Sequence, residues 1–161
     1  IAVMAQISIP MPLGVPMTMQ TFAITLAAVV LGSKLSAMAS LVYLILGAVG
    51  VPVLASFSGG IDKFVGPTGG FLISFPLMAY IIGLGVEHRN AFKGAIPLAV
   101  VVGTVVNYIV GVILFVIVAH STVAVAISAC VLPFIPTAII KAVLACAIGL
   151  NIRKRIPGLK A

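Results

Sequence analysis

Residues 95–119 read AIPLAVVVGTVVNYIVGVILFVIVA, and this stretch decides the class of fold. It contains no charged side chain, and its few polar residues include a single amide, Asn107. An α-helix that spans a membrane needs about 20 consecutive, mostly apolar residues. The stretch therefore predicts a membrane-spanning helix.

The composition of the whole chain agrees with this prediction. Of the 161 residues, 63% are hydrophobic and only 7% are charged, whereas a soluble domain has about 25% charged residues. The chain has too few polar side chains to cover a surface that faces water, but in lipid the apolar residues face outward. We therefore expect an all-α integral membrane protein that forms one domain over residues 1–161.

Prolines, glycines and charged residues divide the chain into six expected helices. Ile1–Ile9 is too short to span a membrane and is interpreted as the end of a truncated first helix. The next four spans are expected at Thr18–Gly32, Leu35–Phe57, Phe71–Val86 and Ala95–Ala119. Thr122–Leu132 is apolar but short, and predicts a re-entrant or interfacial helix. The last span is expected to carry Pro136 in its first turn and to end near Ile152.

The distribution of charge predicts the orientation in the membrane. The chain has 9 Lys and Arg residues against 2 acidic residues, and such cations concentrate in cytoplasmic loops. If the first helix ends outside, Lys63 alone among the loop cations is outside, and the cytoplasmic side holds Lys34, Arg89, Lys93, Arg153, Lys154, Arg155 and Lys160. We therefore expect both termini in the cytoplasm. Anionic lipid accounts for the basic run at 153–155, so nucleic acid is not an expected partner.

The side chains needed for most catalytic sites are missing. The only carboxylates, Asp62 and Glu87, are expected on opposite sides of the membrane, and so are His88 and His120. Paired carboxylates, a metal site and a phosphate-binding loop are therefore not expected. We predict that the chain is not an enzyme, needs no cofactor and cannot hydrolyse ATP by itself.

Three irregular segments point instead to a binding site. Pro10–Met19, Ser58–Gly70 and Pro133–Pro136 are all expected at the outer side. Irregular backbone at membrane depth is tolerated where it is buried in protein or lines a cavity. The segments thus enclose a ligand pocket or are ordinary connecting turns.

Lys141 is the sharpest candidate for a ligand contact. It follows the start of the last helix by about one and a half turns, or roughly 7 Å. A lysine at the bilayer centre costs about 2.5–3.5 kcal/mol, and the last helix has no carboxylate to pair with it. Lys141 therefore contacts an anionic or carbonyl-bearing ligand, or extends to the outer surface.

Other polar residues have two interpretations each. Asn107, in the middle of its helix, contacts a ligand or makes a hydrogen bond between helices. Gln20 and Thr18 are pocket groups or cap the second helix. Tyr43 and Tyr108 are ligand contacts or packing residues.

Taken together, ordered motifs along almost the whole chain resemble one family. The motifs are Gln6–Pro10, Val15–Gln20, Leu31-Gly32, Tyr43 with Leu46–Val53, Gly66–Phe71, Leu132–Pro136 and Lys141. Each is weak alone, but the ordered set resembles the BioY family, the biotin-specific components of energy-coupling-factor (ECF) vitamin transporters.

The resemblance implies a function and partners. It implies six transmembrane helices in the plasma membrane of a prokaryote, with tight capture of biotin from outside. It also implies docking onto a transmembrane coupling protein with two ATPases, although some family members are reported to work without them. The loop that contains Gly66, Thr68 and Gly69 would close over the ligand.

The chain departs from the family pattern at two places. Family members often have an aspartate where this chain has Ala138, so Lys141 needs another acceptor. The small-residue motif of the first helix, which docks the coupling protein, is reduced to Ala2 and Ala5. The rival interpretations are a component for another vitamin, a membrane protein without a ligand and, least of all, a membrane enzyme.

Overall fold

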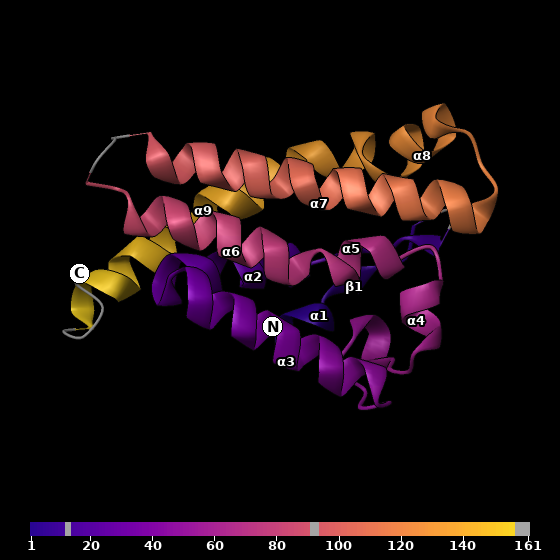
Figure 1. The fold of residues 1–161 in the computed structure, drawn as a ribbon, viewed down its shortest axis with the longest axis horizontal. Helices are drawn as coiled ribbons and strands as arrows, with labels where there is room; N and C mark the ends of the chain where they lie inside the picture. The colour runs from indigo at the N-terminus through magenta and orange to yellow at the C-terminus, as the bar shows by residue number, and fades with distance from the viewer. Residues whose placement is uncertain (12–13, 91–93, 157–161) are drawn as a thin grey trace.

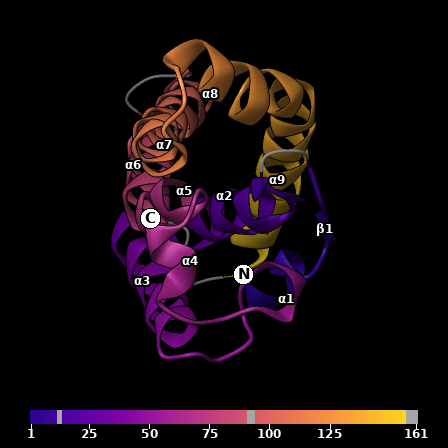
Figure 2. The same ribbon diagram turned by 90° about the vertical axis from the view of Figure 1, so that its right-hand side faces the viewer.

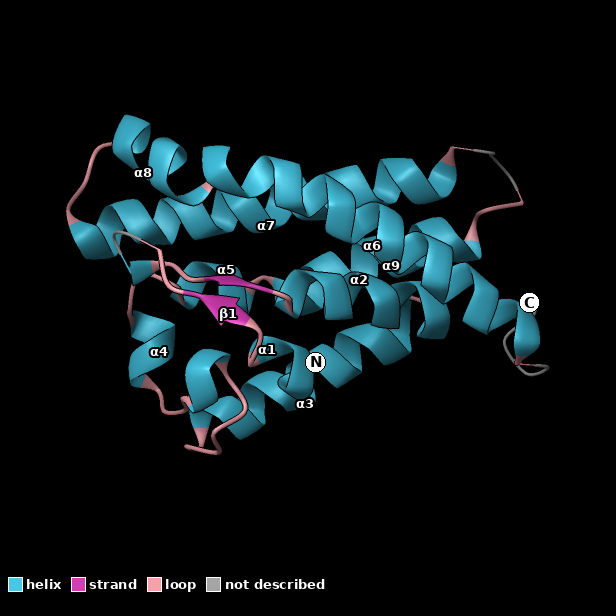
Figure 3. Ribbon diagram, turned by 180° about the vertical axis from the view of Figure 1, so that it is seen from behind, coloured by secondary structure: helices cyan, strands magenta, loops and turns pink. Residues whose placement is uncertain are grey.

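The computed structural model describes residues 1–11, 14–90 and 94–156, and Lys93 and Lys160 lie outside these ranges. The described chain is a bundle of helices with one short β-hairpin (Figure 3). The strands are β1 (Ser8–Ile9) and β2 (Met17–Thr18). The helices are α1 (Ala2–Ala5), α2 (Gln20–Leu31), α3 (Ser33–Ala48), α4 (Asp62–Val65), α5 (Gly69–Ile73), α6 (Phe75–Glu87), α7 (Ala95–Ala119), α8 (Val123–Cys130) and α9 (Ile135–Arg155).

The outer surface of the bundle is apolar. Met38 on α3, Ile113 on α7 and Val143 on α9 each expose more than half of their surface. Two helical stretches are long and apolar enough to cross a membrane, Ala95–Ala119 and Val123–Arg155, and the second contains α8 and α9. Shorter apolar helices, α2, α3 and α6, complete the bundle. The expected all-α fold is thereby confirmed, and the apolar surface agrees with the expected membrane protein.

Helix α2 lies at the centre of the bundle. It packs against α3, α6 and α9, while α6 also packs against α3 and α7 (Figure 1). The core between these helices is built from apolar side chains, including Ile24, Ala28, Met78 and Ile82. Figure 2, which looks onto one end, shows α7 and α9 on opposite sides with α8 joining them.

The two ends of the bundle differ in structure and charge. One end holds the start of α3, the end of α6 and the end of α9 (Figure 1). Its described cations are Lys34, Arg89 and the basic run at 153–155. The other end holds α4, α8 and the hairpin, and Lys63 lies there on α4.

Two expected helices are shorter or less regular than the sequence predicted. The helix expected at Leu35–Phe57 ends at Ala48, because Gly50 takes a positive φ of 97° and Pro52 follows. The helix expected at Phe71–Val86 begins earlier, at Gly69, and breaks at Ser74 into α5 and α6. The helix at Ala95–Ala119 and the position of Pro136 in the first turn of α9 are confirmed.

The hairpin is the largest departure from the expected spans. Ser8 pairs with Thr18 and Ile9 with Met17, so the helix expected from Thr18 begins at Gln20. Helix α2 thus spans only about 18 Å at 1.5 Å per residue, against a hydrocarbon core of about 30 Å. Irregular backbone fills the remaining depth at the hairpin end, and this is where backbone can line a cavity.

Candidate functional site

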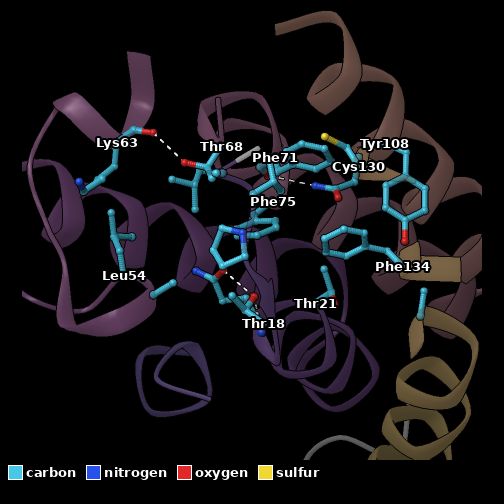
Figure 4. A pocket seen from close by; sticks show the side chains of 18 of the residues that line it. Thr18, Thr21, Leu54, Lys63, Thr68, Phe71, Phe75, Tyr108, Cys130 and Phe134 are labelled. Atoms are coloured by element: carbon cyan, nitrogen blue, oxygen red, sulfur yellow. Dashed lines mark hydrogen bonds between the residues drawn. The ribbon is translucent and has the colours of Figure 1, made fainter. Parts of the chain in front are cut away.

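A cavity of about 320 Å³ opens among the irregular segments at the hairpin end. Its walls come from the loop before α2, the turn at Ala55, helices α4 and α5, the middle of α7, and the chain from Cys130 to Lys141 (Figure 4). Leu54, Phe71, Phe75 and Phe134 make much of the wall apolar. The expected convergence of the three irregular segments on one pocket is therefore present.

Thr18, Gln20 and Lys141 form a continuous hydrogen-bonded group on the wall. The Thr18 hydroxyl donates to Gln20 Oε1 at 2.8 Å, and Gln20 Nε2 donates to the Tyr43 hydroxyl oxygen at 2.6 Å. Lys141 Nζ donates to the Thr18 carbonyl oxygen at 2.6 Å. This chain of bonds joins α9, β2, α2 and α3, so it fixes the positions of these polar groups relative to one another.

Lys141 lies on the cavity wall and is partly buried. An ammonium group has three hydrogens, and its one described hydrogen bond is to Thr18. Ala138, one turn earlier on α9, also lines the cavity. Lys141 can therefore still donate to an anionic or carbonyl oxygen inside the cavity.

Asn107 makes the hydrogen bond between helices that was one of its two interpretations. Its Nδ2 donates to the Phe71 carbonyl oxygen at 3.0 Å and to Ser74 Oγ at 2.7 Å. Phe71 belongs to α5, and Ser74 lies at the break between α5 and α6. Asn107 is only 1% exposed, and it also lines the cavity. The structural role of Asn107 therefore does not exclude a contact with a ligand in the cavity.

Thr68 and Tyr108 line the cavity, but three other expected contacts do not. Gly66 directly follows α4. A Cβ atom at Gly69 would collide with the Phe64 carbonyl oxygen, so the lack of a side chain at Gly69 permits close packing of α5 on α4. Tyr43 is buried behind Gln20, which separates it from the cavity. The structure therefore does not bring Gly66, Gly69 or Tyr43 to the wall.

The burial of Ala2 and Ala5 does not fully agree with their expected role in docking a partner. Ala5 is fully buried in the main core, and Ala2 packs against that core while partly exposed. A residue without exposed surface cannot contact a partner chain. The docking role thus does not fit Ala5, and of the two alanines only Ala2 is partly accessible.

The described residues that line the cavity include cations and no carboxylate. Besides Lys141, Lys63 lines it, a residue that the sequence had indicated only as an outer loop cation. Asp62 forms an ion pair with Lys63 at 2.9 Å, and this hydrogen bond lowers the pKa of the Asp62 carboxyl. Glu87 lies at the end of α6, at the opposite end of the bundle. The site is therefore electrostatically suited to a ligand with negative charge.

Sequence reasoning missed several apolar and hydroxyl residues of the wall. Phe134 and Thr137 flank the start of α9, and Cys130 ends α8. Their only signal was the pair of prolines, Pro133 and Pro136, which indicated an irregular segment without showing which side chains turn inward.

Comparisons with known proteins agree on one family. The model of the BioY family matches residues 1–158. The biotin transporter BioY of Thermotoga maritima is 41% identical over 147 residues, which cover 91% of this chain and 86% of that protein. The biotin transporter BioY2 of Lactococcus lactis is 36% identical over 93% of this chain and 82% of its own. The crystal structure of the S-component for biotin from an ECF-type ABC transporter superposes with a TM-score of 0.86 at 27% identity, covering 96% of this chain and 85% of that one.

Proposed function

This chain belongs to the BioY family, and from that premise we propose that it captures biotin for uptake across a prokaryotic membrane. It acts as the substrate-specific component of an ECF-type transporter. It is a transport protein and not an enzyme, in keeping with its lack of catalytic side-chain sets.

The observation that carries the proposal is the cavity at the hairpin end. Its volume of about 320 Å³ lies within the usual range of small-molecule sites, about 300–1,000 Å³. Biotin has an apolar bicyclic ring and chain, a ureido group and a carboxylate. The aromatic and aliphatic wall suits the ring and chain, while a few fixed polar groups suit the two polar ends.

Lys141 has the central role among the proposed ligand contacts. Its ammonium group would donate to the carboxylate or the ureido oxygen of biotin. Thr18, Gln20, Thr68 and Tyr108 supply further hydrogen-bonding groups that line the same cavity. Because Ala138 has no carboxylate, the Thr18 carbonyl serves as the acceptor that holds Lys141.

A binding assay on the purified chain tests this function. We expect saturable binding of radiolabelled biotin that unlabelled biotin displaces, and that thiamine and riboflavin do not displace. Displacement by one of the other vitamins would favour a component for that vitamin. An absence of binding to all three would favour a membrane protein without a ligand.

We further propose that energy for uptake comes from a coupling protein with two ATPases. The chain has no phosphate-binding loop, so ATP hydrolysis requires partner chains. Vesicles that contain the chain with and without these partners separate coupled from independent uptake. ATP-dependent accumulation only in the complete system is the expected result, and equal uptake in both vesicle types would contradict it.

A further inference from the structure

Asn107 has both of its donor hydrogens occupied by the fold. Its Nδ2 donates to the Phe71 carbonyl oxygen at 3.0 Å and to Ser74 Oγ at 2.7 Å. The Ser74 hydroxyl gives its own hydrogen to the same Phe71 oxygen at 3.0 Å, so Ser74 Oγ can only accept from Asn107.

These partners determine the orientation of the Asn107 side-chain amide. A carbonyl oxygen cannot donate a hydrogen bond. If the amide were flipped, Asn107 Oδ1 would face the Phe71 oxygen and two acceptors would oppose each other. The nitrogen therefore faces the break between α5 and α6, and the oxygen takes the other position.

The remaining oxygen is the group that Asn107 can offer to a ligand. Among the described residues, Asn107 Oδ1 receives no hydrogen bond, and the residue lines the cavity while being only 1% exposed. The oxygen is not fully enclosed by protein, so a group inside the cavity can reach it. Because an amide oxygen accepts hydrogen bonds and cannot donate them, it favours a ligand that brings a hydrogen-bond donor.

We infer that Asn107 acts toward the ligand as an acceptor only, and that its Oδ1 binds a ring N–H of the ureido group of the ligand. The inference rests on the proposed capture of biotin. Lys141, which can only donate, also lines the cavity. The cavity thus offers an acceptor from α7 and a donor from α9, two helices that lie on opposite sides of the bundle in Figure 2.

Two cyclic carbamate analogues of biotin, each with one ring N–H replaced by oxygen, test the inference. One of them places an oxygen against Asn107 Oδ1, so we expect the unmodified chain to bind it at least about tenfold more weakly than biotin. Asn107→Ala should weaken biotin binding and reduce the preference for biotin over that analogue to within about threefold.

Ser74→Ala is the matched control. It removes one partner of the Asn107 nitrogen but leaves the Phe71 carbonyl, which alone keeps the amide in the same orientation. The variant should be less stable and should keep the preference for biotin over the analogue. If Asn107→Ala does not fold, Asn107→Ser is the second variant, because it removes the amide oxygen and leaves a polar hydroxyl at the buried position, and the same loss of preference is expected.

The possible results separate this inference from the proposed function. Unmodified chain that binds both analogues as tightly as biotin overturns the inference, and so does a preference that Asn107→Ala and Asn107→Ser leave unchanged. If the unmodified chain does not bind biotin, the proposed function fails and the inference fails with it.

Discussion

At the scale of single residues, Lys141 presents a charged donor to a cavity with a largely apolar wall. A hydrogen bond to a charged group contributes about 1.5–3 kcal/mol, which corresponds to about 10–100-fold in affinity. We therefore expect Lys141→Met to weaken biotin binding by about that factor in a direct binding assay. Lys154→Met is the control, because Lys154 is exposed at the other end of the bundle. Unchanged affinity in Lys141→Met would remove Lys141 from the site.

Tyr43 is expected to act on the ligand through Gln20. Tyr43→Phe removes the oxygen that accepts from Gln20 Nε2 and leaves a buried donor without that partner. Such a loss costs about 1–3 kcal/mol, so we expect a lower Tm and a biotin affinity reduced by a few-fold. Tyr80→Phe, at a 40% exposed position, should change neither quantity. A Tyr43→Phe variant with normal Tm and affinity would show that the Gln20 contact has no such role.

At the scale of elements, the corner between α2 and α3 is held by side chains from two other helices. Arg153 of α9 donates to the carbonyl oxygens of Val29 and Val30, near the end of α2, at 3.3 and 2.9 Å. Glu87 of α6 accepts from the backbone N–H of Ser33, at the start of α3, at 2.7 Å. A cation thus meets a helix C-terminus and an anion meets a helix N-terminus, which is the favourable arrangement for both helix dipoles.

This corner predicts a loss of stability without a loss of binding. Arg153→Met removes the donors to two carbonyl groups at a 6% exposed position, which we expect to cost about 1–3 kcal/mol and to lower Tm. Biotin affinity should stay within about threefold, because the corner lies at the opposite end from the cavity. Lys154→Met, an exposed neighbour, should leave Tm unchanged. A large loss of biotin affinity in Arg153→Met would contradict the separation of the two ends.

The elements also show what the sequence could predict and what it could not. Long apolar runs specify helices whatever their neighbours, so Ala95–Ala119 was predicted to the residue. The hairpin was missed because two-residue strands have no periodicity, and their pairing of Ser8 with Thr18 depends on tertiary contacts. Lys141 and Asn107 were visible as polar residues in apolar helices. The separation of Tyr43 from the cavity by Gln20 requires coordinates, because spacing along the chain does not show which side chain stands in front.

At the scale of the whole molecule, the asymmetry of charge predicts the direction in which the cavity opens. Lys34, Arg89 and the basic run at 153–155 share one end, and positively charged ends of membrane proteins remain in the cytoplasm. The cavity lies toward the other end, so it should open to the outside, where a captured nutrient arrives. The expected orientation thus agrees with capture of the ligand from outside.

Labelling of single cysteines in intact cells checks this orientation. Cys130→Ser and Cys146→Ser give a background without cysteine, since the chain has only 2. In that background, Ile61→Cys adds a thiol at a 66% exposed position of the hairpin end. Lys34→Cys adds one at the exposed start of α3, at the basic end.

A membrane-impermeant maleimide should label Ile61→Cys in intact cells and Lys34→Cys only after permeabilisation. The reverse pattern would place the cavity on the cytoplasmic side and would contradict capture from outside, because the ligand could then reach the site only after it had crossed the membrane.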